Sequence, residues 1–193
     1  KADIDAILHK SNPKDINNIE TSSEEIKSLI LSAEMPKDIA SEIKSAFKKL
    51  GAKLVAVRSS ATAEDSSAAA WAGQLESYLN TTEKDLLDQV KHCWASLFTP
   101  RAIFYRFEKN LHTTHISVAV VVQKMVESEV AGVAFSVHPV TKDYNQMIIE
   151  AVYGLGEALV SGTLTPDSYV IEKKKWLLLD INTSEQDKML ARS

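Results

Sequence analysis

Arg58 is the residue whose setting most favours chemistry. It follows the short apolar run 54–57 (LVAV) and precedes the small residues Ser59 and Ser60. A guanidinium group binds phosphate oxygens in pairs through a planar fork of donors. Small residues beside it leave room for a ligand and offer backbone N–H groups and hydroxyls. The spacing therefore indicates either a phosphate-binding arginine or an arginine paired with a core carboxylate.

The segment 59–77 offers a second candidate for anion binding. Its single glycine, Gly73, lies in AGQ, and the GxxxxGK[ST] and GxGxxG patterns are both absent from it. Backbone amides of a Ser/Thr/Ala loop would then have to hold phosphates without a glycine cradle. A plain surface loop is the alternative. The turn 154–157 (GLGE) is a further, weaker anion-binding pattern at a helix start.

Gln123 and Lys124 interrupt an apolar strand, and their side chains should point to opposite faces. An adenine edge or the end of a neighbouring strand would satisfy the amide of Gln123. The histidines show no metal-ligand spacing, so no metal site is predicted among His9, His92, His112, His115 and His138.

Composition limits the class of protein. The chain has 193 residues, 45% hydrophobic and 25% charged, which is typical of one globular domain or two small ones. A net charge of −4 without a basic stripe argues against a nucleic-acid partner. No apolar run is long enough to cross a membrane. The single cysteine, Cys93, excludes an internal disulfide, fits a cytoplasmic location, and falls in an apolar helical stripe where burial is expected.

The elements that must position these residues begin with a helical segment over 1–50. Ser22 and Glu25 have capping-box spacing, so a helix is predicted to begin there. Pro36 should open the next helix, and Gly51 should end it. Residues 54–57 and 75–79 then read as strands of a hairpin.

A pair of helices is predicted over 82–109. The first begins near Thr82 and Asp85, and the second begins at Pro100 with its inward residues at Ile103, Phe104 and Phe107. The remainder is mostly strand: 116–126 and 130–137 as one antiparallel hairpin, 147–152, a helical turn, and a closing hairpin of 169–172 with 176–181. This pattern predicts an α+β fold, largely antiparallel, with a packed helical hairpin.

Six ordered motifs resemble one family. They are VAVRSSATAED (55–65), WAGQLESYLN (71–80), KHCWASLFTPRAIFYR (91–106), VAVVVQKMV (118–126), AGVAFSVHPVT (131–141) and YGLGEALVSGTLTPDSY (153–169). Their order resembles the N-terminal nucleotide-binding domain shared by phosphoenolpyruvate synthase, pyruvate phosphate dikinase and rifampicin phosphotransferase.

The resemblance implies an incomplete ATP-grasp subdomain over 51–193, after the helical segment 1–50. It implies ATP as the ligand, bound by Arg58, Gly73, Ser77 and Gln123, with the backbone at Met125 and Val126 against the base. Arg58 would also be the catalytic group. In this family ATP phosphorylates a histidine on a swivelling domain, which passes the phosphoryl group to pyruvate or to a drug hydroxyl.

Several family parts have no counterpart in this sequence. The Mg²⁺ ligands, the phosphohistidine domain and the acceptor-binding domain are all expected outside it, and none of its histidines matches the phosphorylated one. The resemblance therefore implies part of an ATP-dependent phosphotransferase that is inactive alone. A rifampicin-phosphotransferase-like enzyme and a non-catalytic nucleotide-binding module remain alternatives.

Overall fold

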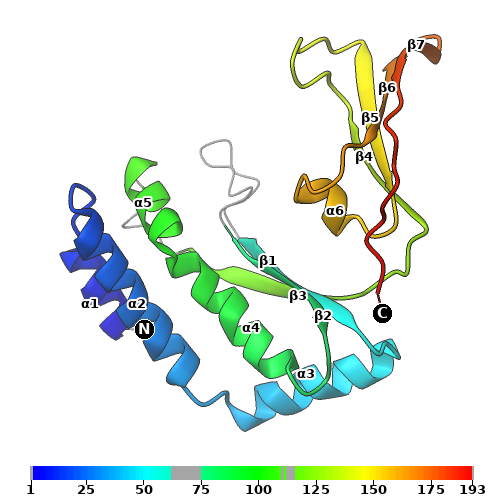
Figure 1. Ribbon diagram of the computed structural model, residues 1–193. Helices are drawn as coiled ribbons and strands as arrows, with labels where there is room; N and C mark the ends of the chain where they lie inside the picture. The colour runs from blue at the N-terminus through cyan, green and yellow to red at the C-terminus, as the bar shows by residue number, and fades with distance from the viewer. Residues whose placement is uncertain (1, 62–74, 110, 112–115, 193) are drawn as a thin grey trace. The chain divides into compact units, whose positions relative to one another are not determined.

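The computed structural model describes residues 2–61, 75–109, 111 and 116–192 of the chain. The chain forms two compact units, Lys1–Met125 and Val126–Ser193, which are described separately. Among the described residues, the first unit holds a three-stranded sheet with five α-helices, and the second holds a four-stranded sheet with one short helix. Figure 1 shows these elements.

Three helices open the first unit: α1 (Ala2–Lys10), α2 (Ile16–Ser32) and α3 (Lys37–Leu50). The predicted boundaries of α3 are confirmed. Pro36 lies immediately before its first turn, and Gly51 ends it with a left-handed φ of 61°, which a glycine adopts without steric cost. The helices over 1–50 therefore follow from local signals.

The predicted start of a helix at Ser22 is wrong. α2 begins six residues earlier, where the side chain of Asp15 accepts a hydrogen bond from the Asn18 amide. Ser22 lies inside the helix, buried, and its hydroxyl accepts a hydrogen bond from that of Ser11 at 2.9 Å. The capping-box spacing at 22–25 was a coincidence of residue types, and the aspartate ahead of it supplies the cap.

The first sheet has the order β2-β1-β3, all antiparallel. Its strands are β1 (Val55–Ala61), β2 (Ser77–Thr81) and β3 (Val118–Lys124). The predicted hairpin of β1 and β2 is confirmed, but β1 does not end at Arg58. It continues through Ser59 and Ser60, so these residues alternate between the two faces of the sheet instead of beginning a loop.

Two helices follow β2 as predicted, but they do not pack on each other as the predicted helical hairpin would require. α4 (Leu86–Ala95) passes through the short 3₁₀ turn η1 (Ser96–Phe98) into α5 (Pro100–Glu108). The Thr99 hydroxyl caps α5 by accepting a hydrogen bond from the Ala102 amide at 3.2 Å. α4 packs against the sheet and α2 packs on α4, so the helices cover one face of the sheet (Figure 1).

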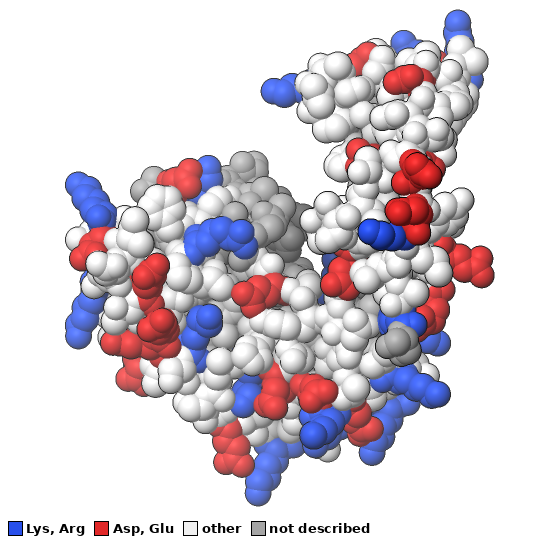
Figure 2. Space-filling model, viewed as in Figure 1, with Lys and Arg blue, Asp and Glu red and all other residues white. Residues whose placement is uncertain are grey.

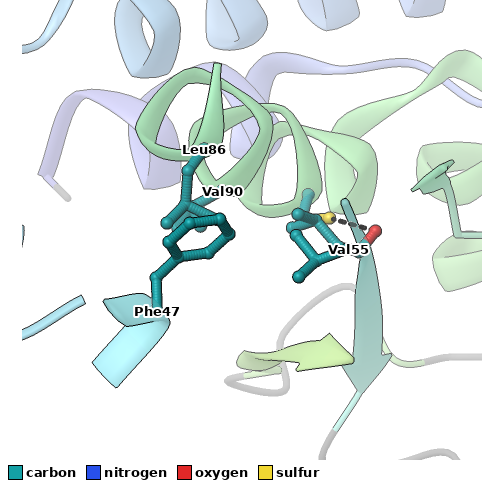
Figure 3. Packing of buried hydrophobic residues seen from close by; sticks show 6 residues of the cluster. Phe47, Val55, Leu86 and Val90 are labelled. Atoms are coloured by element: carbon teal, nitrogen blue, oxygen red, sulfur yellow. Dashed lines mark hydrogen bonds between the residues drawn. The ribbon is translucent and has the colours of Figure 1, made fainter. Parts of the chain in front are cut away.

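The main core of this unit lies between the sheet and α4. Phe47 from α3 meets Leu86 and Val90 from α4, with Val55 from the sheet beside them (Figure 3). Val55 and Leu86 are fully buried. Burying such side chains contributes roughly 1.5–3 kcal/mol each, which holds β1 rigidly against the helices.

Two predictions about inward residues and pairing are wrong. Phe104 is 51% exposed, whereas Ala102, Ile103 and Arg106 form the buried stripe of α5. β3 does not form a hairpin with β4 (Val130–Phe135): β3 pairs with β1, and β4 pairs with β5. A short connection permits a hairpin but does not compel one when each strand has a better partner elsewhere.

The second unit is an antiparallel sheet of order β4-β5-β6-β7. β5 (Gln146–Tyr153) is followed by the helical turn α6 (Glu157–Val160), and β6 (Asp167–Glu172) pairs with β7 (Leu177–Asn182). The predicted third strand, helical turn and closing hairpin are thus confirmed. Ile148, Val152 and Ala158 are buried where α6 meets the sheet.

Acidic and basic side chains are interspersed over the visible face of the first unit (Figure 2). No helix among the described residues is long and apolar enough to cross a membrane.

Candidate nucleotide-binding site

The first sheet has one face against the helices and one exposed face, and the alternation of β1 assigns its side chains to them. Val55 and Val57 belong to the core beneath α4. Arg58 is offset by one residue and therefore points to the opposite face. Burial of Val55 and Val57, which precede it, forces the arginine outward, because a one-residue slip would put its charge in the core.

Residues paired with Arg58 share its exposed face. In the antiparallel register, Arg58 lies directly between Ser77 of β2 and Val121 of β3. Directly opposite residues have Cβ atoms about 5 Å apart and point the same way. The Ser77 side chain is exposed, and Val121 is 49% exposed. Arg58, Ser77 and Val121 thus form one row across the sheet.

Arg58 has no counter-ion among the described residues. It is exposed, and in this part of the chain no carboxylate lies within ion-pairing distance of its guanidinium. The alternative interpretation, an arginine paired with a core carboxylate, therefore finds no support among these residues. No described residue takes up its donors either.

Gln123 lies on the same face of the sheet, two register positions from the pair of Arg58 and Val121. It is opposite Ala56 in the register and exposed. Being two residues from Val121, it stands diagonally from Arg58 at roughly 7–8 Å between Cβ atoms. A ligand lying across this face can reach a guanidinium at one end and a carboxamide at the other.

The other predicted site residues are not part of the row formed by Arg58, Ser77 and Val121. Met125 follows β3, and its amide donates to the Leu54 carbonyl at 3.2 Å, so this amide is used within the chain. Val126 is 72% exposed and belongs to the second unit, which is described separately. Gly73 lies outside the described residues.

A cluster on the opposite face was missed by the sequence analysis. The Ser59 hydroxyl donates to the Glu76 carbonyl at 2.7 Å, and the Tyr78 hydroxyl donates to the Glu76 carboxylate. The Tyr78 ring also contacts the His92 ring, with centroids 5.6 Å apart. Extending the strand past Arg58 would have placed Ser59 on the helix side, since alternation alone requires it.

Two buried titratable groups flank the core. Burial first, and then the nearby Glu76 carboxylate, raises the pKa of Cys93 to about 12. Its thiol donates to the Val57 carbonyl at 3.6 Å, the contact dashed in Figure 3, so the expected burial of this cysteine is confirmed. Burial lowers the pKa of Arg106 to about 10, and its guanidinium lies 5.1 Å from the centre of the Phe98 ring.

One pocket formed by described residues lies on the helical side of the first unit. It has a volume of about 560 Å³ and is bounded by the segment between α2 and α3, by α3 and by α4, with Met35, Lys44 and Lys91 in its walls. None of the predicted site residues lines it.

Two amides of the turn 154–157 are taken up by the chain itself. The Gly154 amide donates to the Glu129 carbonyl at 2.8 Å, and the Leu155 amide donates to the Leu190 carbonyl at 2.8 Å. These two donors of the sequence pattern are therefore not open to an anion. This turn holds the segment before β4 and the C-terminal segment together.

Metal ligands are not gathered in the described part of the chain. It contains no group of three or more His, Cys, Asp or Glu side chains placed to hold an ion. The described residues therefore do not fit a complete Mg²⁺ site.

The fold and exposed face define a mixed helix and sheet protein that offers cationic and amide donors on an antiparallel sheet. The chain belongs to the pyruvate phosphate dikinase, AMP/ATP-binding domain family, whose model matches residues 1–193.

Its relatives include phosphoenolpyruvate synthases of archaea. The phosphoenolpyruvate synthase of Pyrococcus furiosus is 44% identical over 97% of this chain and 24% of its own length. The probable phosphoenolpyruvate synthase of Archaeoglobus fulgidus is 48% identical over 97% of this chain and 26% of its own length. The chain thus spans about a quarter of the length of these relatives.

Proposed function

We propose that this chain forms one side of the ATP site of a phosphotransferase similar to phosphoenolpyruvate synthase, built on an ATP-grasp fold. The reaction would convert ATP, pyruvate and water to AMP, phosphoenolpyruvate and phosphate by way of a phosphohistidine. A reducing, cytoplasmic setting fits the single buried cysteine.

The observation that carries the proposal is the setting of Arg58. Within a family of AMP/ATP-binding domains, it is an exposed arginine without a described ion pair, beside Ser77 and diagonal to Gln123 on one sheet face. We assign Arg58 to the phosphates and Gln123 to the adenine edge. Ser77 adds a hydroxyl at the phosphate end.

Phosphoryl transfer depends mainly on positioning and on neutralising charge. Arg58 supplies a fixed positive charge and a bidentate donor, and the buried Val55 and Val57 that precede it hold its strand in place. Mg²⁺, when bound, would neutralise further phosphate charge through ligands outside this sequence. The assignment of Arg58 to the phosphates and Gln123 to the adenine involves no acidic residue of the described surface.

The first test removes the guanidinium. In the Archaeoglobus fulgidus relative, the matching segment is replaced by this chain, which gives the parent chimera. ATP affinity and AMP formation are then compared between the parent chimera and its Arg58→Ala variant. We expect ATP affinity or AMP formation to fall by more than about tenfold, which corresponds to roughly 1.4 kcal/mol.

Arg101→Ala is the matched control. Arg101 is also an exposed arginine of the first unit, but it lies on α5 in the helix layer. Its loss removes the same charge from the unit and should leave AMP formation within about twofold of the parent. Equal activity of Arg58→Ala and Arg101→Ala would assign Arg58 a structural role and overturn the proposal.

The identity of the phosphoryl acceptor needs a separate measurement. Sequence motifs such as CWASLFT and SVHPVT favour a rifampicin-phosphotransferase-like member, whereas the relatives described above are phosphoenolpyruvate synthases. The domain that chooses the acceptor lies outside this sequence, so the test must use the native full-length protein with pyruvate and with a rifamycin offered in parallel.

A further inference from the structure

The pairing of β1 with β2 ends at the row that contains the proposed phosphate ligands. The register runs through Val55–Thr81 and Val57–Tyr78 to Arg58–Ser77, with an irregularity after its first pair. A short ladder with a bulge is prone to fray at its end. Ser77 therefore needs further contacts to stay beside Arg58.

Ser59 supplies one contact immediately past the last pair. Its hydroxyl donates to the carbonyl of Glu76, the residue before Ser77, at 2.7 Å. The distance is that of a strong neutral hydrogen bond. It joins the two strands where the backbone register stops, and so limits the movement of Ser77 away from Arg58.

Tyr78 supplies a second contact to the same residue. Its hydroxyl donates to the Glu76 carboxylate, and its ring packs against His92 and the core beneath α4. Glu76 is thus held by its carbonyl from β1 and by its carboxylate from β2. Through the ring of Tyr78, the contact to Glu76 is connected to the buried core beneath α4.

Both anchors act from the side of the sheet opposite the ligand. Ser59 is one residue from Arg58, and Tyr78 is one residue from Ser77, so alternation turns both toward the helices. A ligand on the exposed face cannot contact either side chain. Their influence on it must pass through the position of Ser77 and Arg58.

We propose that Ser59, assisted by Tyr78, is a positioning residue that holds Ser77 beside Arg58 and so tunes the affinity of the exposed sheet face for the phosphates of a nucleotide. This inference rests on the proposed function. It predicts a loss confined to the phosphate end of the ligand, because Gln123 lies on β3, which pairs with β1 over seven register positions independently of β2.

The test compares ATP and adenosine affinities, measured by calorimetry, for the chimera carrying Ser59→Ala, Ser59→Thr and Tyr78→Phe. We expect Ser59→Ala to weaken ATP about three- to tenfold while adenosine is unchanged, as for the loss of one hydrogen bond. Ser59→Thr keeps the hydroxyl and suits a strand, so it should restore ATP affinity. Tyr78→Phe should show a smaller loss of the same kind.

Ser23→Ala is the matched control. The Ser23 hydroxyl also donates to a distant carbonyl, that of Phe98 at 2.6 Å, but between α2 and η1 in the helix layer. It reports on loss of a similar bond in the same unit without a change at the sheet. Hydrogen exchange of residues 76–81 should accelerate in Ser59→Ala and stay at the parent rate in Ser23→Ala.

The outcomes separate the two proposals. If Arg58→Ala weakens ATP but Ser59→Ala does not, the positioning role is overturned and the proposed function stands. If Ser59→Ala weakens ATP and adenosine equally, the effect is general damage and the positioning role is again overturned. If Arg58→Ala leaves ATP affinity unchanged, the proposed function is overturned, and the positioning role falls with it even where residues 76–81 loosen in Ser59→Ala.

Discussion

Neighbouring residues of β1 have different tasks because a strand points them to opposite faces. Val57 packs into the core, Arg58 projects from the exposed face, and Ser59 returns to the helix side to bind the Glu76 carbonyl. Each assignment follows from the burial of the valines. A single-residue insertion in the strand before Val57 would exchange all three environments.

Cys93 illustrates a side chain whose chemistry is suppressed by its position. It is fully buried, and its pKa is raised from 9.0 to about 12, so the reactive thiolate is scarce. We expect iodoacetamide to leave the folded chain unmodified at about pH 8 and to modify it fully in urea, as measured by mass spectrometry. Rapid labelling of the folded chain would contradict the described burial.

The raised pKa of Cys93 predicts that the free energy of unfolding depends on pH. In the folded chain the thiol stays protonated up to about pH 12, whereas the unfolded chain loses its proton near 9.0. The folded state then binds more protons, so this contribution is complete below pH 9.0 and is lost as the pH rises toward 12. Urea unfolding should show a shallower alkaline decline for Cys93→Ala than for the parent, and an equal decline would oppose this assignment.

Among the strands, the choice of partner matters more than the length of the connection. β3 pairs with β1 over seven register positions and β4 pairs with β5 over six, although only a few residues separate β3 from β4. This arrangement gives each compact unit its own sheet. It also places Gln123 on the sheet that carries Arg58, which a β3–β4 hairpin would not have required.

The C-terminal segment of the second unit depends on close approach to Gly154. This residue has φ of 82°, and an added Cβ would lie 2.3 Å from the Leu190 carbonyl oxygen. We expect Gly154→Ala to destabilise the unit, since it adds a steric clash to left-handed strain of about 1–3 kcal/mol. Hydrogen exchange should show faster exchange over residues 183–192.

Gly162→Ala provides the control for backbone strain alone. Gly162 has φ of 68° in the same unit, but an added Cβ would meet no atom within 4 Å. Chemical denaturation should therefore show a smaller loss of stability for Gly162→Ala than for Gly154→Ala. Equal losses would mean that the Leu190 contact contributes little.

The whole chain corresponds to about a quarter of the length of its phosphoenolpyruvate synthase relatives. Its described residues offer donors for phosphates and a base, but no cluster of acidic or histidine ligands for a metal ion. We expect the 193-residue chain alone to form no AMP from ATP, because the metal ligands and phosphohistidine of the proposed reaction lie outside it.

Chromatographic detection of AMP checks this expectation. The chimera with the Archaeoglobus fulgidus relative serves as the positive control under identical conditions. Turnover of ATP to AMP by the isolated chain would show that it contains a complete catalytic site. This result would contradict the proposal that the chain forms only one side of the ATP site.

Local signals in the sequence predicted most elements. The apolar stripe of 86–98, Pro100 at a helix start, Gly51 at a helix end and the β-branched run in 116–126 all specify structure over a few residues. The failures were of a different kind. Ser22 matched a cap pattern inside a helix, and Phe104 was assigned inward although Arg106 is buried there, because tertiary packing selects which side of a helix is covered.

The sequence by itself determined the family, the order of the elements and the position of Arg58 on an apolar strand. Only the tertiary structure decided that β3 pairs with β1 and that Arg58, Ser77 and Gln123 share one exposed face. It also decided that the Ser59 hydroxyl donates to the Glu76 carbonyl from the opposite face. Pairing and register are set by contacts between residues far apart in the chain, whose summed burial and hydrogen bonding outweigh local preference.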